Sequence, residues 1–97
     1  MKNEPNIYPL KEAIEEFLKF YRLEDKLKER KVLDAYPEVV GELIMRHTLD
    51  FWIWKKVLYV KVDSAPLRNE LIMARTTLMR NLNKKAGAQV IEDIVLR

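Results

Sequence analysis

The sequence predicts an α+β domain in which two N-terminal helices precede a strand, strand, helix, strand unit. Apolar residues recur at helical spacing early in the chain and again after residue 64, whereas they alternate with other residues between positions 48 and 62. The 97 residues suffice for one core, so we expect a single domain over residues 1–97 with a flexible N-terminus at 1–8.

The N-terminal helices follow from apolar periodicity. The first helix is predicted from Pro9, whose missing N–H suits a first turn, and its apolar residues are Leu10, Ile14, Phe17, Leu18 and Tyr21. The charge-dense residues 22–30 are interpreted as a turn or short helix. A second helix is predicted over residues 32–44, with a kink or restart near Tyr36, because the residue before Pro37 resists the helical conformation. Gly41 would lie inside this helix, which indicates close packing.

Residues 49–62 predict an antiparallel hairpin with a two-residue turn at Lys55 and Lys56. One face of the hairpin would carry the apolar pairs Leu49 with Val62, Phe51 with Val60, and Ile53 with Leu58. The opposite face would pair Asp50 with Lys61, Trp52 with Tyr59, and Trp54 with Val57. Because Lys-Lys lacks the Gly or Asn that tight turns prefer, a longer loop is the alternative.

The third helix is predicted to begin after Ser64, which is a good N-cap. Its buried stripe would consist of Leu67, Leu71, Ala74, Leu78 and Leu82. Lys84 and Lys85 complement the dipole of the last turn, and Gly87 can end the helix in a left-handed cap. Residues 90–96 are rich in β-formers and predict the third strand.

Several classes of chemistry lack their parts in this sequence. With zero Cys and one His, neither a thiolate metal site nor a nucleophilic triad can be assembled, and His47 is interpreted as a structural residue at a strand edge. Gly41 and Gly87 lie too far apart for a phosphate-cradling loop. We therefore expect no enzyme activity, no metal and no cofactor. The absence of a long apolar run favours a cytoplasmic protein without membrane contact.

Charge is distributed unevenly along the chain. Residues 1–50 hold nine Lys or Arg against eleven Asp or Glu, whereas residues 51–97 hold nine against four. Such a basic half is typical of a nucleic-acid footprint and also of ordinary solvated helices. The cations predicted to contact a phosphate backbone are Lys55, Lys56, Lys61, Arg68, Arg75, Arg80, Lys84 and Lys85. This prediction requires them to converge into one strip in three dimensions.

An aromatic cluster is the second candidate feature. Trp52, Trp54 and Tyr59 share the hairpin face that bears Lys61, and aromatic rings on an open sheet can stack on unpaired bases. The competing interpretation is that the first helix covers this face. The covering side chains would be Phe17, Leu18 and Tyr21. We favour coverage, because two exposed tryptophans on a monomer risk aggregation.

Ile72 and Met79 extend the apolar arc of the third helix beyond what one sheet should bury. They either pack against the N-terminal helices or contact a partner protein. The residues alone therefore leave two function classes open. One is a nucleic-acid-binding domain, and the other is a protein-interaction module that binds a partner or a second copy of itself through Ile72, Met79 or the face of Trp52 and Trp54.

A set of short segments occurs in order along the chain: Ala35-Tyr36-Pro37-Glu38-Val39-Val40-Gly41, His47-Thr48, Leu58-x-Val60-x-Val62-x-Ser64, Glu70-Leu71, Leu82-Asn83, Gly87 and Asp93-Ile94. This ordered set resembles the DciA family of bacterial proteins, over residues 10–97. The resemblance implies a fold similar to a K-homology domain, in which a three-stranded sheet packs on a helix. It also implies a role in DNA replication, in which the protein helps the replicative helicase onto single-stranded DNA without hydrolysing ATP.

The partners implied by the resemblance are single-stranded or double-stranded DNA and the replicative helicase. Tyr36 stands where the family usually has Trp, and it should still fill a core position. The sequence has no Gly-x-x-Gly loop, with which K-homology domains clamp nucleotides, so that binding mode is not carried over. Longer members of the family have a disordered extension that helps engage helicase or DNA, and helicase contact through such a tail is not carried over either.

Overall fold

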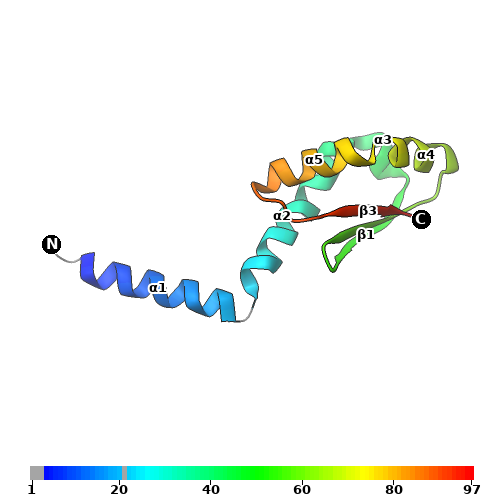
Figure 1. The fold of residues 1–97 in the computed structure, drawn as a ribbon. Helices are drawn as coiled ribbons and strands as arrows, with labels where there is room; N and C mark the ends of the chain where they lie inside the picture. The colour runs from blue at the N-terminus through cyan, green and yellow to red at the C-terminus, as the bar shows by residue number, and fades with distance from the viewer. Residues whose placement is uncertain (1–3, 21) are drawn as a thin grey trace.

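The computed structural model describes residues 4–20 and 22–97, with side chains from Pro9 onward in those ranges. A globular body contains a three-stranded sheet with helices on one face, and one helix projects from it (Figure 1). The elements are α1 (Glu4–Phe20), α2 (Leu23–Val40), α3 (Glu42–Arg46), β1 (Thr48–Trp54), β2 (Val57–Val62), α4 (Ala65–Met73), α5 (Arg75–Ala86) and β3 (Asp93–Leu96). The predicted α+β fold class is confirmed.

The sheet has the order β1-β2-β3, with β1 antiparallel and β3 parallel to the central strand β2. The predicted hairpin register is confirmed at every pair except Leu49 with Val62. A β-bulge between Thr48 and Asp50 places Thr48 opposite Val62 and leaves Leu49 60% exposed. An extra residue in one strand interrupts the alternation between the two faces of the sheet. Leu49, which lies in the bulge, therefore does not face inward as the alternation predicted.

The hairpin turn consists of Lys55 and Lys56, as predicted. Their φ angles are 48° and 65°, and positive values at both central residues are typical of a type I′ turn, which matches the twist of the flanking strands. The backbone N–H of Glu92 also donates to the Lys56 carbonyl at 2.7 Å. The paired strands thus impose a conformation that lysine does not itself favour, and no longer loop is needed.

The interpretation of residues 22–30 as a turn or short helix is wrong, because residues from Leu23 onward form the first half of α2. This stretch is rich in Lys, Glu, Leu and Arg, which favour helix even where few apolar residues anchor it. Glu24 and Asp25 lie in the first turn, where carboxylates stabilise the helix dipole. Propensity therefore extends the helix beyond its buried stripe.

The expected restart near Tyr36 is wrong, since α2 continues through Pro37 as one helix, and a kink there stays a prediction. Burial of Val32 and Tyr36 in the core holds this part of the helix in place and offsets the hydrogen bond that Pro37 cannot make. The helix ends at Gly41, whose φ is 87°. A Cβ at Gly41 would meet nothing within 4 Å, so its backbone conformation, and not close packing, accounts for the glycine.

The predicted third helix is two helices, α4 and α5, that meet at Ala74. Both predicted caps are confirmed: the Ser64 side chain accepts a hydrogen bond from the Leu67 N–H at 3.4 Å, and Gly87 is left-handed with φ 77°. Ala74 was expected in the buried stripe but is exposed, because the chain leaves helical geometry there and turns that position outward. The buried members of the stripe are Leu71, Leu78 and Leu82.

Asn83 holds the loop between α5 and β3. Its Nδ2 donates to the Ile91 carbonyl at 2.9 Å, while its Oδ1 accepts from the backbone N–H groups of Val90 and Ile91 at 2.9 and 3.0 Å. Val90 and Ile91 are buried, and β3 begins only at Asp93, later than predicted. One side chain thus satisfies three backbone groups of a buried segment that has no strand partner.

Replacing Asn83 with alanine should lower the free energy of unfolding by about 2–3 kcal/mol, because buried backbone groups would lose their partners. Urea denaturation measures this loss. Asn83→Asp keeps the acceptor and loses the donor, so it should fall between wild type and Asn83→Ala. A loss below about 0.5 kcal/mol in the alanine variant would contradict the assigned role.

α1 begins at Glu4, before the predicted start at Pro9, and projects from the body to give overall dimensions of 61 × 22 × 20 Å (Figure 1). Its contacts with the described chain are mainly with α2. The prediction that Phe17 and Leu18 cover the aromatic face is therefore wrong, and Tyr21 lies outside the described residues. Arg22, in a left-handed conformation with φ 58°, turns the chain between the two helices and directs α1 away from the sheet.

Candidate nucleic-acid interface

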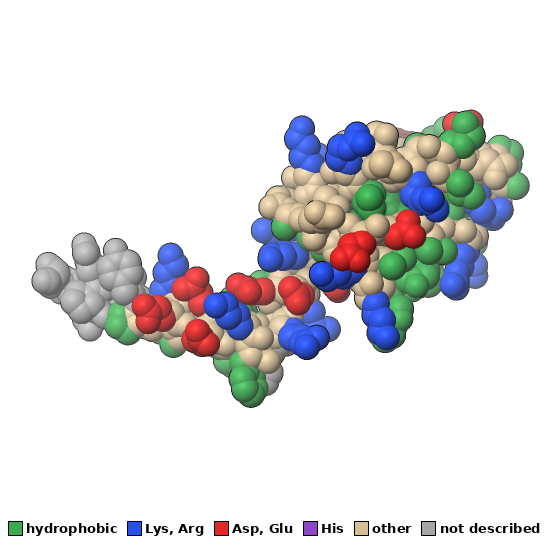
Figure 2. All heavy atoms as spheres, in the orientation of Figure 1, with side chains coloured by type: hydrophobic (Ala, Val, Ile, Leu, Met, Phe, Trp, Pro, Cys, Tyr) green, Lys and Arg blue, Asp and Glu red, His purple; other side chains and the backbone are tan. Residues whose placement is uncertain are grey.

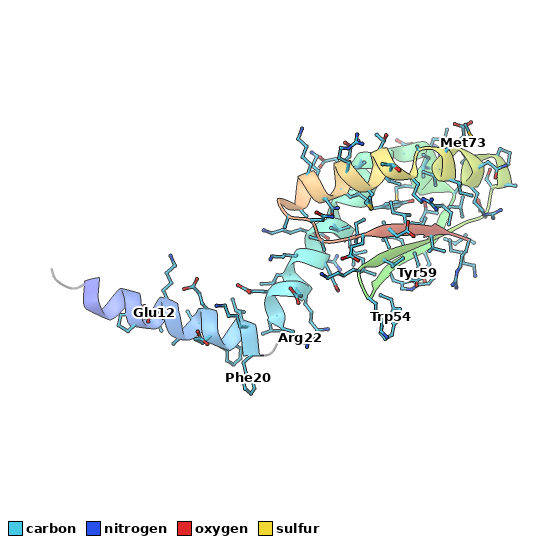
Figure 3. The ribbon with its side chains drawn as sticks, viewed as in Figure 1. Glu12, Phe20, Arg22, Trp54, Tyr59 and Met73 are labelled. Carbon is cyan, nitrogen blue, oxygen red and sulfur yellow. The ribbon has the colours of Figure 1, made fainter. Side chains whose placement is uncertain are left out.

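The sheet has an inner face, against the helices, and an outer face, which no described element covers. Leu58, Val60 and Ile94 point inward and are fully buried. Strand alternation therefore directs Tyr59 and its β1 partner Trp52 to the opposite side. Figure 3 shows Trp54 and Tyr59 on the side of the sheet that faces away from α4 and α5. We define the outer face by Trp52, Trp54, Tyr59, Lys61 and Arg97.

The aromatic side chains of the outer face are arranged in two neighbouring rows. Trp52 and Tyr59 stack with ring centroids 5.5 Å apart and an interplanar angle of 8°. Both are half-buried by this contact, whereas Trp54, one row nearer the turn, is 60% exposed. The face thus presents a rigid pair of rings beside an accessible indole, and such rings can stack on bases.

Cations surround these rings. The Lys55 Nζ lies 5.4 Å from the centre of the Trp54 ring, and the Arg97 guanidinium lies 5.2 Å from the centre of the Tyr59 ring. Arg97 extends β3 beside Lys61, because its N–H donates to the Val60 carbonyl and its carbonyl accepts from the Val62 N–H. Lys61 is exposed. The outer face therefore combines π-surfaces with cations at both ends of the aromatic rows.

Arg97 was absent from the sequence-based set of cations. The sequence nevertheless contained a signal for Arg97. Residues 93, 95 and 97 alternate with the inward-facing Ile94, so their side chains lie on the outer side of the third strand. Because the pairing of β3 with β2 was not predicted, the alternating residues of the third strand could not be assigned to one face of the sheet or the other.

The other predicted cations have different surroundings. Arg68 is half-buried on α4, where its Nη2 donates to the Val62 carbonyl at 2.6 Å and its Nε has no hydrogen-bond partner. Lys56 lies 3.8 Å from Glu92, and Arg75 lies 3.7 Å from Asp93. Lys85 pairs with Glu38, and this hydrogen bond and the lysine charge lower the pKa of the Glu38 carboxyl. These four cations are thus partly occupied within the molecule.

Arg80 and Lys84 border a shallow groove of about 500 Å³ on α5. The groove is lined by Thr76, Met79, Arg80, Asn83, Lys84, Gly87, Ala88 and Gln89. Because α5 packs on the inner face of the sheet, this groove is not part of the outer face. Of the predicted cations, Lys55 and Lys61 thus lie at the outer face and Arg80 and Lys84 at the groove, and the eight do not form one continuous strip.

The two apolar residues singled out on the third helix have different environments. Met79 is half-buried against the core and also lines the α5 groove, whereas Ile72 is 44% exposed near the α4–α5 junction. Next to it, Met73 is 80% exposed. The exposed apolar surface of α4 and α5 therefore lies mainly at their junction. The junction contains no glycine.

His47 has a structural environment at the open end of the hairpin. Its Nδ1 lies 2.8 Å from the Asp63 Oδ1, and its carbonyl accepts from the Asp63 N–H at 3.0 Å. Among the described residues, no group of three His, Cys, Asp or Glu is placed to hold a metal ion. No helix in the described part of the chain is long and apolar enough to span a bilayer.

Comparison with known proteins adds the family to this geometry. The family model described as Dna[CI] antecedent, DciA, matches residues 9–96. The chain belongs to the DciA family. Membership in DciA implies a role in helicase loading during DNA replication. Among curated proteins, no sequence matched this DciA chain.

Proposed function

We propose that this DciA domain binds single-stranded DNA through the outer face of its sheet and thereby assists loading of the replicative helicase. The observation that carries the proposal is the uncovered aromatic cluster, with Trp54 60% exposed and cations over two of its rings. Stacking on aromatic rings requires unpaired bases, so this surface suits a single strand better than a duplex.

In this mode, bases stack on the indoles of Trp52 and Trp54 while the backbone passes Lys55, Lys61 and Arg97. Stacking is sequence-tolerant, because every base has a π-face, and the cations contact phosphates irrespective of sequence. A loading factor needs this kind of affinity, since it must hold whichever strand is exposed. No bond is made or broken in this role, and the proposed site of action is the bacterial cytoplasm.

Dependence of DNA affinity on salt tests the proposal. Lys61→Gln with Arg97→Gln should reduce the slope of log affinity against log salt by about 0.7 for each cation removed, because each phosphate contact on a single strand releases counterions in that proportion. The matched control is Arg80→Gln with Lys84→Gln, which removes the same charge from the α5 groove. Fluorescence anisotropy with a labelled oligothymidine measures both slopes.

The control should retain the wild-type slope. Equal effects of the two pairs would mean that general charge, and not the outer face, determines binding. A changed slope in the α5 pair alone would move the DNA site to the groove beside Arg80 and Lys84.

A protein-interaction module is the second candidate, favoured by the exposure of Ile72 and Met73 at the α4–α5 junction. In that case the domain would contact the helicase, or another protein of the replication machinery, through this junction and would not need DNA. Absence of measurable oligonucleotide binding at low salt, together with capture of purified helicase that Met73→Asp abolishes, would support this candidate over the first.

A further inference from the structure

A small pocket lies between the start of α2 and the hairpin turn, two segments that are far apart in the sequence. Its volume is about 260 Å³, and it is lined by Arg22, Asp25, Lys28, Glu29, Lys55, Lys56 and Val90. Figure 2 shows Lys and Arg side chains where α2 meets the body, with Asp and Glu side chains among them. The tertiary structure thus brings cations from two segments to one pocket.

The pocket has an excess of positive charge that the chain does not neutralise. Four of its lining side chains are cations and two are carboxylates, which leaves a net charge of +2. Among the side chains that the structure describes, Arg22, Lys28 and Lys55 have no ion-pair partner. Lys56 lies 3.8 Å from Glu92, which does not line the pocket. A phosphate group of DNA carries about one negative charge within a strand and about two at a free end, so either form fits this excess.

The size of the pocket also favours a single charged group. Pockets that enclose whole small molecules have volumes of about 300–1,000 Å³, and this pocket is smaller. Val90 is buried, and the backbone N–H of Glu92 donates to the Lys56 carbonyl at 2.7 Å. This hydrogen bond ties the hairpin turn to the segment before β3, so one wall of the pocket is fixed before a ligand binds.

The hairpin turn keeps lysines at the pocket although its backbone disfavours them. Lys55 and Lys56 have φ angles of 48° and 65°, which Gly or Asn adopt at lower cost. Strained backbone of this kind is found mostly at functional positions. A less strained turn made of Asn and Gly would leave neither of these cations at the pocket.

The pocket adjoins the outer face of the sheet, because Lys55 lines the pocket and also places its Nζ 5.4 Å from the centre of the Trp54 ring. We propose that the pocket is a phosphate subsite, which holds a phosphate of the single strand whose bases stack on the outer face. The inference rests on the proposed function. It adds Arg22, Lys28 and Lys56 to the cations that contact the strand.

Arg22→Asn with Lys28→Gln tests the subsite. Asparagine tolerates the left-handed backbone of residue 22, so the corner between α1 and α2 is retained. The double variant should bind a labelled oligothymidine about tenfold more weakly at low salt, because a charge-assisted contact is lost. The slope of log affinity against log salt should fall by about 0.7, the value for one phosphate contact on a single strand. Fluorescence anisotropy measures both quantities.

The matched control is Lys26→Gln with Lys31→Gln, which removes the same charge from exposed positions of α2 that do not line the pocket. It should bind as the wild type does. Oligothymidines that end in a hydroxyl, a 5′-phosphate or a 3′-phosphate distinguish the two sources of the phosphate. A loss confined to one phosphorylated end would assign the pocket to a strand terminus, and an equal loss with all three would assign it to an internal phosphate.

Lys56→Gly separates the subsite from the stability of the fold. Glycine adopts the backbone of residue 56 without strain, so the unfolding midpoint should rise by a few degrees while affinity for the oligothymidine falls several-fold. A damaged fold cannot produce this combination. Unchanged affinity in Lys56→Gly would contradict the subsite.

The outcomes also separate the subsite from the proposed function. Wild-type affinity and slope in Arg22→Asn with Lys28→Gln would overturn the subsite and leave the outer face as the DNA site. Equal losses in the Lys26 and Lys31 control would overturn it as well, since general charge would then explain them. A wild type that binds no oligonucleotide would overturn the subsite together with the proposed function.

Discussion

Replacing Trp52 and Trp54 together with alanine should weaken binding to a single-stranded oligonucleotide by about thirtyfold or more. Each stacked base contributes about 1–3 kcal/mol, and removing two indoles removes at least about 2 kcal/mol of that interaction. The chain contains only these two tryptophans, and both lie on the outer face. Quenching of intrinsic fluorescence by oligothymidine therefore reports directly on this surface in the wild type, and anisotropy of a labelled strand reports the affinity of the variant.

Two controls separate stacking from a general loss of apolar surface. Trp52→Phe with Trp54→Phe keeps aromatic rings and should retain most of the affinity. Leu43→Ala removes an apolar side chain that is 58% exposed on α3, away from the outer face, and should bind as the wild type does. Unquenched tryptophan fluorescence in a fully formed DNA complex would exclude the outer face as the binding surface.

Replacing Tyr36 with alanine should lower the free energy of unfolding by about 3–5 kcal/mol, enough to leave a domain of this size barely folded. Tyr36 is fully buried, and its ring centroid lies 4.6 Å from that of Phe51. Its hydroxyl is 3.2 Å from Thr48 Oγ1, which itself donates to the Ile44 carbonyl at 2.7 Å. The tyrosine hydroxyl is therefore the donor of the pair. Urea denaturation measures the loss, and a change below about 1 kcal/mol would contradict this packing.

The same residue makes stability depend on pH in the alkaline range. Burial raises the pKa of Tyr36 above its ordinary value of 10.0, because the phenolate loses hydration in the core. Because this pKa is higher in the folded state than in the unfolded state, the contribution of Tyr36 to the free energy of unfolding is fully present below pH 10. It decreases as the pH rises through the pKa of the folded state. Tyr36→Phe should abolish this part of the alkaline loss while costing about 1 kcal/mol at neutral pH. An unchanged alkaline profile in Tyr36→Phe would assign the loss to other groups.

Much of the fold could be predicted because it depends on neighbours along the chain. The alternation of residues 50–62 determined the hairpin register, and local chemistry at Ser64 and Gly87 located the ends of the third helical segment. The errors arose where propensity and burial compete over several turns. Leu23 to Arg30 became helical although few apolar residues anchor them, and Pro37 was accommodated because buried neighbours hold α2 in place.

Asn83 illustrates a residue that periodicity cannot explain. It was part of the family resemblance, yet its reason became visible only in the bonds to Val90 and Ile91. The aromatic residues of the candidate site were identified correctly as sharing one face, since Trp52 and Tyr59 are register partners. The register alone did not indicate whether another part of the chain covers that face.

The sequence by itself determined the fold class, the hairpin register from Asp50 to Lys61, the caps at Ser64 and Gly87 and the two faces of that hairpin, because these follow from periods and local hydrogen bonds. Only the tertiary structure decided that α1 leaves the sheet open, that the predicted cations do not form one strip, and that Arg97 joins the aromatic cluster. These outcomes depend on how distant segments meet. The left-handed conformation of Arg22, between α1 and α2, and the parallel pairing of β3 with β2 set that arrangement, and neither leaves a periodic signal in the chain.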